Sequence, residues 1–290
     1  MKRSIDSKTM NDAEAVVAIG GIGGSGTRVV AQIISLLGYH IGNQLNKESD
    51  NLLFTLLFKN PGWFIKANSG QFRKRFRVFR KIMTGKRLGI NEMRILLAAA
   101  LTNKTEPASL RTAFEALTEN LLQTMKKTNS RWGWKEPNTH IYLDWIAETE
   151  QHFKYIHVIR HGLDMAFSHN KQQVNNWGFL FGIGKPEHDN EDLLILNQLD
   201  YWIKANKKVI GFCREKLGKK FYLLNYNTLL NNPTTEMGKL AQFLEVDTLG
   251  VNGLTDLVKK PVTDGRYRTV DLSVFRQEQL DEVMKLGFEI

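Results

Sequence analysis

The sequence predicts a three-layer α/β fold, in which a central, mostly parallel β-sheet is covered by helices on both faces. Three observations predict it. An apolar run at 15–19 ends in a glycine-rich turn that leads into a helical pattern. Two further apolar runs, at 153–159 and 221–225, alternate with helical patterns, as parallel strands covered on both faces do. The 290 residues suffice for one domain with a substantial core, so we expect a single domain over residues 1–290.

The expected elements follow the chain in a simple order. Residues 1–14 are polar and do not have the layout of a secretory signal, so we expect a flexible tail. A strand over Ala15–Ile19 precedes a helix over 27–38, which ends at Gly38. Residues 50–130 show only helical patterns and are expected to form a helical insertion. The helices expected within it are 50–58, 72–83, 91–101 and 109–127, and after it we expect strands at 132–137, 153–159 and 221–225 and helices at 141–151, 163–173, 192–217 and 234–244.

Composition limits the class of partner. The formal net charge is +10, which indicates an anionic partner without identifying it. Part of the excess lies at Gln71–Arg87, where basic residues alternate with phenylalanines. This stretch is either a solvated helix face above packed rings or a patch that touches an acceptor or a membrane. Cys213 is the one cysteine, so no internal disulfide forms, and we expect a buried thiol in a cytoplasmic protein. No apolar run reaches the roughly 18 residues of a membrane span.

The glycine-rich turn satisfies two nucleotide-binding patterns incompletely. Gly21–Gly26 fits G-x-G-x-x-G, but no second strand ends in an acidic residue about 20 positions later. It also fits G-x-x-x-x-G, but Thr27 and Arg28 stand where a Walker A loop has Lys and Ser or Thr. Both patterns share a cradle of backbone N–H groups at a helix N-terminus, which binds anions. The candidate anion-binding residues are Gly23, Gly24, Ser25, Gly26, Thr27 and Arg28.

A second candidate anion site follows the run at 153–159. Arg160 stands at the end of that expected strand, and Ser168 follows eight residues later, in the expected helix. Arg offers a forked, charge-assisted contact and Ser a hydroxyl donor, so the loop between them lets both converge on one anion. Asp164 lies between them, in the first turn of the helix, where its charge suits the helix dipole.

These two motifs resemble the nucleotide-binding motifs of sulfotransferases that use 3′-phosphoadenosine-5′-phosphosulfate (PAPS). Ser25–Arg28 looks like the loop that binds the 5′-phosphosulfate, and Arg160, Asp164 and Ser168 match the 3′-phosphate motif of that family. The resemblance covers roughly residues 15–270 and is patchy in the helical insertion. It implies a P-loop-like nucleotide-binding fold, PAPS as donor, 3′,5′-adenosine bisphosphate (PAP) as product, and acceptor specificity within the insertion.

Weaker similarities extend the expected site. Lys135 belongs to a Lys-x-Pro element that lies near the phosphosulfate in several branches of the family. Tyr226 corresponds to a tyrosine beside the adenine, while Arg266 and Arg268 fall where the family brings basic residues to the 3′-phosphate. One position departs from the pattern, because Gly24 replaces the basic residue that starts the family's phosphosulfate loop. Lys135 is the first candidate to replace that cation, and Arg28 is the second.

The expected chemistry needs a base for the acceptor but no metal. Asp50 is the candidate base, with Glu48 beside it, although both acids could simply begin the next helix. Three histidines compete for the role, and His157 fits better as a structural residue of its strand. No cluster of cysteine and histidine ligands is visible, so no metal is expected. The competing histidines are His140, His157 and His161.

The sequence therefore predicts a sulfotransferase acting on a hydroxyl or an amine. A carbohydrate or lipid-linked acceptor is expected from aromatic residues around the insertion, which are equally compatible with a core. Two other functions remain open: a P-loop-type small-molecule kinase, and a non-catalytic binder of nucleic acid or anionic lipid through residues 71–87. Under the first prediction no nucleic-acid partner is expected, peripheral membrane contact stays open, and the oligomeric state is not predicted. The aromatic residues are Trp63, Phe64, Phe72, Trp177 and Phe179.

Overall fold

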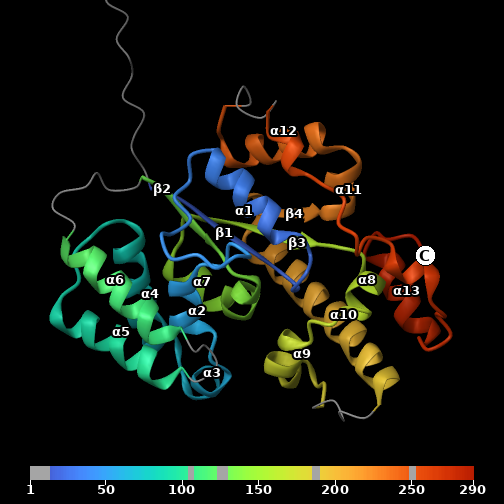
Figure 1. Cartoon of the computed structure of the whole chain (residues 1–290), viewed down its shortest axis with the longest axis horizontal. Coiled ribbons are helices and arrows are strands. Elements are labelled where there is room, and N and C mark those ends of the chain that lie inside the picture. The colour runs from blue at the N-terminus through green and yellow to red at the C-terminus, as the bar shows by residue number, and fades with distance from the viewer. Residues whose placement is uncertain (1–13, 104–107, 123–129, 185–189, 248–252) are drawn as a thin grey trace, which may run out of the picture.

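A central sheet of four parallel strands organises the molecule. The computed structural model describes residues 14–103, 108–122, 130–184, 190–247 and 253–290, so the predicted tail lies outside the described residues except for Glu14. The strand order is β2-β1-β3-β4, and the described strands all pair in parallel (Figure 1). Their bounds are β1 Ala15–Gly21, β2 Arg131–Lys135, β3 Phe153–Ile159 and β4 Phe221–Asn225.

The register brings the carboxyl ends of three strands to one edge. Gly21 of β1 pairs with Val158 of β3, and Ile19 pairs with Lys135 of β2. The segments that follow these strands therefore start side by side, although the segment after β1 is more than a hundred residues from the other two in sequence. This is the edge where ligands bind in open parallel sheets.

Helices cover both faces of the sheet, which confirms the predicted three layers. On one face, Val17 and Ile19 of β1 pack with Val30 and Ile33, and Leu240 completes the same apolar cluster. That face is covered by α1 Thr27–Leu36, α11 Tyr226–Asn231 and α12 Pro233–Leu244 (Figure 1).

The opposite face carries the larger core. Val16 and Ala18 of β1 and Tyr155 of β3 point into it and pack against the remaining helices. These helices are α2 Leu52–Phe58, α3 Pro61–Lys66, α4 Ser69–Met83, α5 Ile90–Thr102, α6 Ser109–Leu122, α7 Leu143–Thr149, α8 Gly162–Ala166, α9 Gln172–Trp177, α10 Glu191–Lys216 and α13 Gln277–Lys285. Short 3₁₀ segments occur at Pro137–Tyr142, Gly178–Phe181, Gly218–Lys220, Thr255–Leu257 and Arg266–Thr269.

The stretch expected as a helical insertion has helices α2 to α6 and no strand in its described parts, residues 52–103 and 108–122. Its aromatic side chains pack onto β2: the ring of Phe54 stacks on Trp134 with centroids 5.5 Å apart, and Phe79 meets the same ring edge-on at 5.4 Å. The last part of the helix predicted over 109–127 falls in residues 123–129, which are outside the described residues. The insertion thus shares one continuous core with the sheet.

The basic stretch lies on α4 and the turn after it. Phe72, Phe76 and Phe79 are fully buried beneath the helix, as expected for a helix face above packed rings. Arg75 lies over the ring of Trp63 at 4.0 Å, and burial lowers the pKa of Arg75 to about 10.

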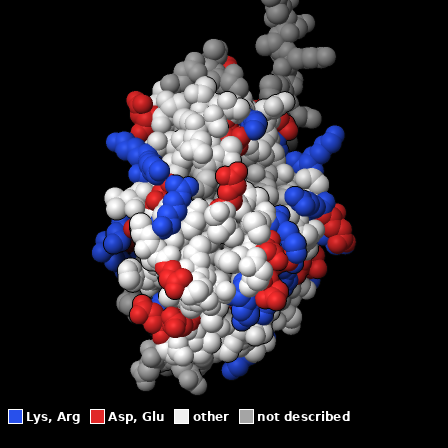
Figure 2. Space-filling model, turned by 90° about the vertical axis from the view of Figure 1, so that its right-hand side faces the viewer, with Lys and Arg blue, Asp and Glu red and all other residues white. Residues whose placement is uncertain are grey.

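Figure 2 shows that acidic and basic side chains are interspersed on the face bearing α13, so the positive charge is not gathered there. Within the described residues, no helix is both long and apolar enough to cross a bilayer.

The predicted helix at 163–173 is wrong as a single element. It is divided into α8, which ends at Ala166, and α9, which begins at Gln172. Between them the Ser168 hydroxyl accepts a hydrogen bond from the Asn170 N–H at 3.3 Å, and the Asn170 side-chain Oδ1 accepts one from the Gln172 N–H at 3.1 Å. Such side-chain bonds compete with helical backbone bonds, so Ser168 lies after α8 and not within it.

Candidate functional site

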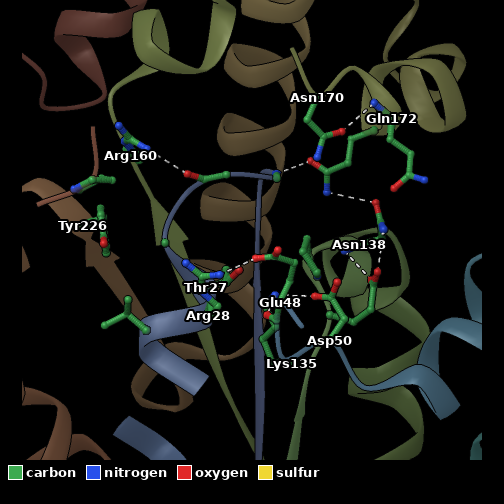
Figure 3. A pocket seen from close by; sticks show the side chains of 18 of the residues that line it. Thr27, Arg28, Glu48, Asp50, Lys135, Asn138, Arg160, Asn170, Gln172 and Tyr226 are labelled. Carbon is green, nitrogen blue, oxygen red and sulfur yellow. Dashed lines mark hydrogen bonds and ion pairs between the residues drawn. The ribbon is translucent and has the colours of Figure 1, made fainter. Parts of the chain in front are cut away.

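A cavity of about 400 Å³ opens at the carboxyl edge of the sheet. Arg160 and Tyr226 lie on one side of it and Asn138 and Gln172 on the other, with the glycine loop running between them (Figure 3). The segments after β1, β2 and β3 all contribute to its wall. The polar residues and glycines that line it are Gly23, Gly24, Gly26, Thr27, Arg28, Glu48, Asp50, Lys59, Lys135, Glu136, Asn138, Arg160, Asn170, Gln172, Gln173, Tyr226 and Thr263.

The glycine loop has a backbone that only glycine adopts easily. Gly24 has φ +87° and Gly26 has φ +93°, both in the left-handed region. A Cβ on Gly26 would also stand 2.3 Å from the ring of Tyr226. The absence of a side chain at Gly26 therefore allows the ring to close over the loop.

The loop presents an anion-binding surface at the start of α1. No side chain caps this helix N-terminus among the described residues, so the N–H groups of Thr27 and Arg28 have no side-chain partner there, while the Val29 N–H donates to the Gly26 carbonyl at 3.1 Å. Ser25 is 1% exposed, and its hydroxyl has no hydrogen-bond partner in the described part of the chain. An unsatisfied buried hydroxyl is costly, and an anion in the cradle would satisfy it.

Arg160 is held beside this loop by a set of fixed contacts. Its guanidinium pairs with Asp164 at 3.1 Å and donates hydrogen bonds to the Gly24 carbonyl at 3.3 Å and the Thr263 hydroxyl at 3.2 Å. Arg160 and Asp164 are 4% and 1% exposed, and the Gly265 N–H donates to the same carboxylate oxygen at 2.9 Å. The two predicted anion motifs therefore meet in one cavity, on strands that are neighbours in the sheet.

Three residues expected at the second anion site do not line the cavity. The Ser168 hydroxyl is bonded to the Asn170 N–H, as described above. Arg266 donates to the Phe167 carbonyl at 3.0 Å, and burial lowers its pKa, helped by the positive charge of Arg160. Arg268 lies over the ring of Tyr267 at 5.7 Å. The roles expected of Ser168, Arg266 and Arg268 stay predictions.

The candidate catalytic cation and base contact each other. The Lys135 side chain, 3% exposed, pairs with the Asp50 carboxylate and donates to the Glu48 carbonyl at 2.9 Å. The other Asp50 oxygen accepts from Asn46 Nδ2 at 2.9 Å. Arg28 instead pairs with Glu48 at 2.9 Å near the mouth, where about half of each side chain is exposed. The structure places Lys135, Asp50 and Arg28 in the cavity wall, but their catalytic roles stay predictions.

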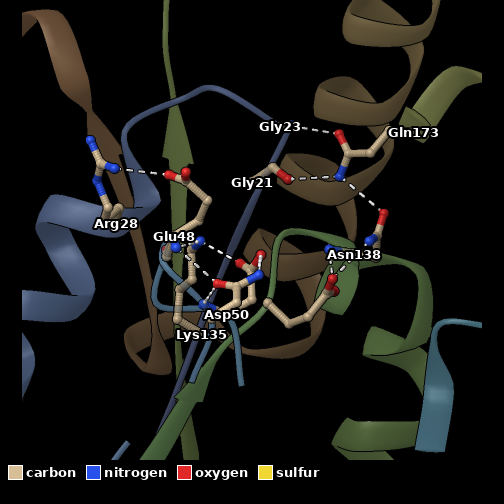
Figure 4. Close-up of polar contacts among 10 residues, drawn as sticks. Gly21, Gly23, Arg28, Glu48, Asp50, Lys135, Asn138 and Gln173 are labelled. Atoms are coloured by element: carbon tan, nitrogen blue, oxygen red, sulfur yellow. Dashed lines mark hydrogen bonds and ion pairs between the residues drawn. The ribbon is translucent and has the colours of Figure 1, made fainter. Parts of the chain in front are cut away.

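A chain of polar side chains that the sequence did not reveal connects the end of β2 to the glycine loop (Figure 4). The Glu136 carboxylate accepts hydrogen bonds from the Asn138 N–H at 2.6 Å and from its side-chain amide at 2.9 Å. Gln173 donates to the Asn138 side chain at 3.1 Å and accepts from the Gly23 N–H at 2.5 Å. It also donates to the Gly21 carbonyl at 3.4 Å. Glu136 stands in the Lys-x-Pro element, but no local signal marks Gln173.

Glu136 differs from the other acids of the cavity because it is 1% exposed. Burial raises the pKa of Glu136 to about 7, and the negative charge of Asp50 adds to the effect. The positive charge of Lys59 and the hydrogen bonds from Asn138 act in the opposite direction. A carboxyl group with this pKa can give or accept a proton near neutral pH.

The competing histidines have structural partners away from the cavity. His157 bonds to Tyr155 at 2.9 Å and to Asn206 at 2.8 Å, and burial lowers its pKa to about 4. Burial likewise lowers the pKa of His140 to about 3, while His161 contacts the Glu289 carbonyl at 2.7 Å. None of the three histidines lines the cavity.

The aromatic residues that suggested an acceptor belong mainly to the core. Phe72 and Trp177 are fully buried, and Trp63 and Phe64 pack against the same cluster. Phe179 is the exception, at 46% exposed. These rings therefore carry no argument about the acceptor.

Comparison with known proteins identifies the family. The sequence matches the sulfotransferase family over residues 17–249. No curated protein matches it significantly. Among solved structures, it is similar to the sulfotransferase domain of the Synechococcus PCC 7002 olefin synthase, with a TM-score of 0.51, 12% identity and 100% of each chain covered. At this identity the likeness shows the fold alone.

Two other solved structures have lower scores. The sulfotransferase domain from the curacin biosynthetic pathway gives a TM-score of 0.49 and 14% identity, covering 96% of this chain and 99% of that one. Sulfotransferase STF1 from Mycobacterium tuberculosis gives 0.47 and 12%, covering 94% and 77%. The family match spans most of the chain, and a parallel sheet with an anion-binding loop at its carboxyl edge accompanies it. The chain therefore belongs to the sulfotransferase family.

Proposed function

We propose that this protein transfers a sulfuryl group from PAPS to an acceptor hydroxyl or amine and releases PAP. The observation that carries the proposal is the meeting of two anion sites in one cavity. The start of α1 lies after the end of β1, and among the described residues it has no side-chain cap and the Ser25 hydroxyl beside it has no partner. Arg160 lies at the end of the neighbouring strand, and its guanidinium touches the glycine loop itself. A nucleotide with phosphates at both ends of its ribose matches this arrangement.

Each anion site suits one end of the donor. The N–H groups of the segment from Gly24 to Arg28 would hold the 5′-phosphosulfate. Arg160 would hold the 3′-phosphate with a forked contact, and Ser168, Arg266 and Arg268 remain candidates to join it. The ring of Tyr226 borders the cavity beside Gly26 and offers a face for the adenine.

The transfer needs positioning and charge stabilisation more than covalent help. The donor supplies an activated sulfuryl group whose bridging oxygen gains negative charge as the group leaves. Lys135 is the buried cation in the cavity wall best suited to stabilise that charge, and Arg28 is the second candidate. Asp50 fixes the Lys135 ammonium and is also the base that the sequence predicted. This cationic role would compensate for Gly24, where the family has a basic residue.

The acceptor side of the cavity is rich in amides. Asn138, Asn170 and Gln172 lie opposite Arg160 (Figure 3), and Gln173 lines the same cavity. Amides donate and accept hydrogen bonds, so this wall supports a neutral acceptor with several hydroxyl groups, such as a carbohydrate.

A lipid-linked acceptor has separate support on the helical insertion. The exposed face of α6 carries Leu110, Phe114 and Leu121, which are 44%, 60% and 57% exposed. Their spacing puts them on one stripe of the helix, which suits peripheral contact with a membrane. We further propose a cytoplasmic location, in keeping with the one, buried cysteine.

Replacing Arg160 tests the proposal. Arg160→Ala removes a charge-assisted contact of about 1.5–3 kcal/mol. We therefore expect calorimetry to show PAP binding weakened about 10- to 100-fold. Arg94→Ala, which removes one exposed charge from α5, should bind PAP like the wild type. Because Asp164 loses its partner in the first variant, the double variant Arg160→Ala/Asp164→Asn controls for folding.

Two outcomes of that calorimetry would reject parts of the proposal. Unchanged PAP binding by Arg160→Ala would remove Arg160 from the 3′-phosphate site. Titrations of the wild type with Mg-ATP and with duplex DNA test the kinase and the nucleic-acid binder. Tight binding of either one, without PAP binding, would replace the sulfotransferase reaction with that rival function.

A further inference from the structure

Glu136 lines the cavity but has no role in the transfer as proposed above. It follows Lys135 directly at the end of β2, so the register that brings β2 beside β1 also brings this carboxyl group toward the glycine loop. The backbone and side chain of Asn138 bond to its two oxygens, which fixes the orientation of the carboxyl plane. Gln173 links Asn138 to the Gly23 N–H, so Glu136 is positioned relative to the loop expected to hold the sulfuryl group.

Asp50 is the other acid in this part of the cavity, and its contacts give it a different task. Its carboxylate pairs with Lys135 and also accepts from Asn46. To serve as a base, Asp50 would have to give up its ion pair with Lys135, whose side chain is 3% exposed. Removing one partner of such a pair is costly, so Asp50 serves better as the fixed counter-ion of Lys135.

The surroundings of Glu136 favour uptake of a proton instead. Asp50 faces it from the segment before α2, and its negative charge disfavours a second carboxylate. Lys59 faces it from the end of α2 and stabilises the carboxylate, so the ionised form stays accessible. Tyr142 and Tyr201 lie near enough to be affected by its charge, and burial raises the pKa of both phenols, so neither competes for the proton at neutral pH.

We infer that Glu136 is the general base of the transfer reaction, an inference that rests on the proposed function. The Glu136 carboxylate takes the proton of the acceptor hydroxyl while the acceptor oxygen forms its bond to sulfur. The bond between sulfur and the bridging oxygen breaks in the same step, and its electron pair leaves on the phosphate of PAP. Lys135 stabilises that departing oxygen, and Glu136 later releases the proton to solvent. Lys135, the last residue of β2, thus serves the leaving group, and Glu136, which follows it, serves the nucleophile.

Glu136 also has a structural role, which the test must separate from catalysis. Its side chain caps the 3₁₀ segment Pro137–Tyr142 by accepting from the Asn138 N–H. Glu136→Gln keeps an oxygen for this cap and removes the base. Glu148→Gln makes the same chemical change at an exposed position of α7 and is the matched control.

The first measurement is turnover of PAPS as a function of pH, followed as PAP formation with water as the acceptor. In the wild type the rate should rise through about pH 7 as Glu136 loses its proton and then level off. The rate of Glu136→Gln should not rise with pH and should be about 10²- to 10⁴-fold lower than that of the wild type. Glu148→Gln should have the rate and the pH dependence of the wild type. An unchanged rate and pH profile in Glu136→Gln would overturn the inference.

Two binding and titration experiments make the result independent of turnover. Calorimetry should give the same PAP affinity for Glu136→Gln and the wild type, because Glu136 acts on the acceptor. Failure of the wild type to bind PAP would instead reject the proposed function. Carbon-13 labelling of glutamate carboxyls should show one resonance, missing in Glu136→Gln, that titrates near pH 7. Titration of that resonance at the ordinary value of a glutamate would count against Glu136 as the base.

Discussion

The glycine loop and the end of β2 lie side by side in the sheet, yet they hold their polar groups in opposite ways. The loop presents backbone N–H groups, and the buried Ser25 hydroxyl beside them has no partner among the described residues. At the end of β2 the polar groups are side chains that already have partners, as Lys135 has in Asp50 and Glu136 has in Asn138. A backbone cradle is ready for an anion, whereas the side chains at the end of β2 are already held in place by their own partners.

Removing Lys135 should have the largest effect on stability. Lys135→Ala leaves Asp50, whose side chain is 18% exposed, without its cation. Loss of one partner from a buried pair costs about 3–5 kcal/mol, and the partial exposure of Asp50 places the expected loss at the lower end. Urea unfolding measures it. Lys135→Ala/Asp50→Ala should recover much of the stability, and no recovery would mean that the side chains at this end of the cavity act independently.

The backbone-held loop should be sensitive to a single added methyl group. Gly26→Ala forces a left-handed residue, at about 1–2 kcal/mol, and drives its Cβ into Tyr226. Gly38→Ala is the matched control, since Gly38 has φ +91° but no heavy atom within 4 Å of an added Cβ. We expect the free energy of unfolding of Gly26→Ala to be about 1–3 kcal/mol lower than that of Gly38→Ala, because the added methyl group overpacks against the ring. We also expect Gly26→Ala to lose PAP binding. Equal urea midpoints would show that Tyr226 does not close over the loop.

Arg28 should have the smallest effect on stability, because its pair with Glu48 is about half exposed. Such pairs contribute about 0–1 kcal/mol, and salt screens them. Arg28→Ala should therefore leave the urea midpoint nearly unchanged at 0.5 M salt. If this variant were as unstable as Lys135→Ala, burial could not explain the contrast between the two cations.

Much of the fold could be predicted because its signals are local. The bounds of β3 and β4 agree with the predicted strands, and the glycine turn marks the end of β1. The short helix α3 was missed, although Asn60 and Pro61 form a cap and first helical residue that signal a start. The break between α8 and α9 was missed because it depends on side-chain bonds of Ser168 and Asn170.

Site residues that belong to a sequence motif could be predicted, and the others could not. Lys135, Arg160 and Tyr226 line the cavity, as their motifs indicated, and so does the glycine loop apart from the buried Ser25. Gln173 was missed, because its contacts with Gly23 and Asn138 join residues far apart in the chain. The burial that sets Glu136 apart comes from the packing of several elements, which no sequence pattern expresses.

Gln173 makes the two ends of the cavity thermodynamically dependent on each other. Its amide holds the Gly23 N–H with its oxygen and the Asn138 side chain with its nitrogen, so it cannot turn without changing both contacts. A ligand that shifts this amide at one end alters the affinity of the other end. Linkage makes such a coupling reciprocal, so under the proposed function whatever factor the nucleotide imposes on acceptor binding, the acceptor imposes equally on the nucleotide.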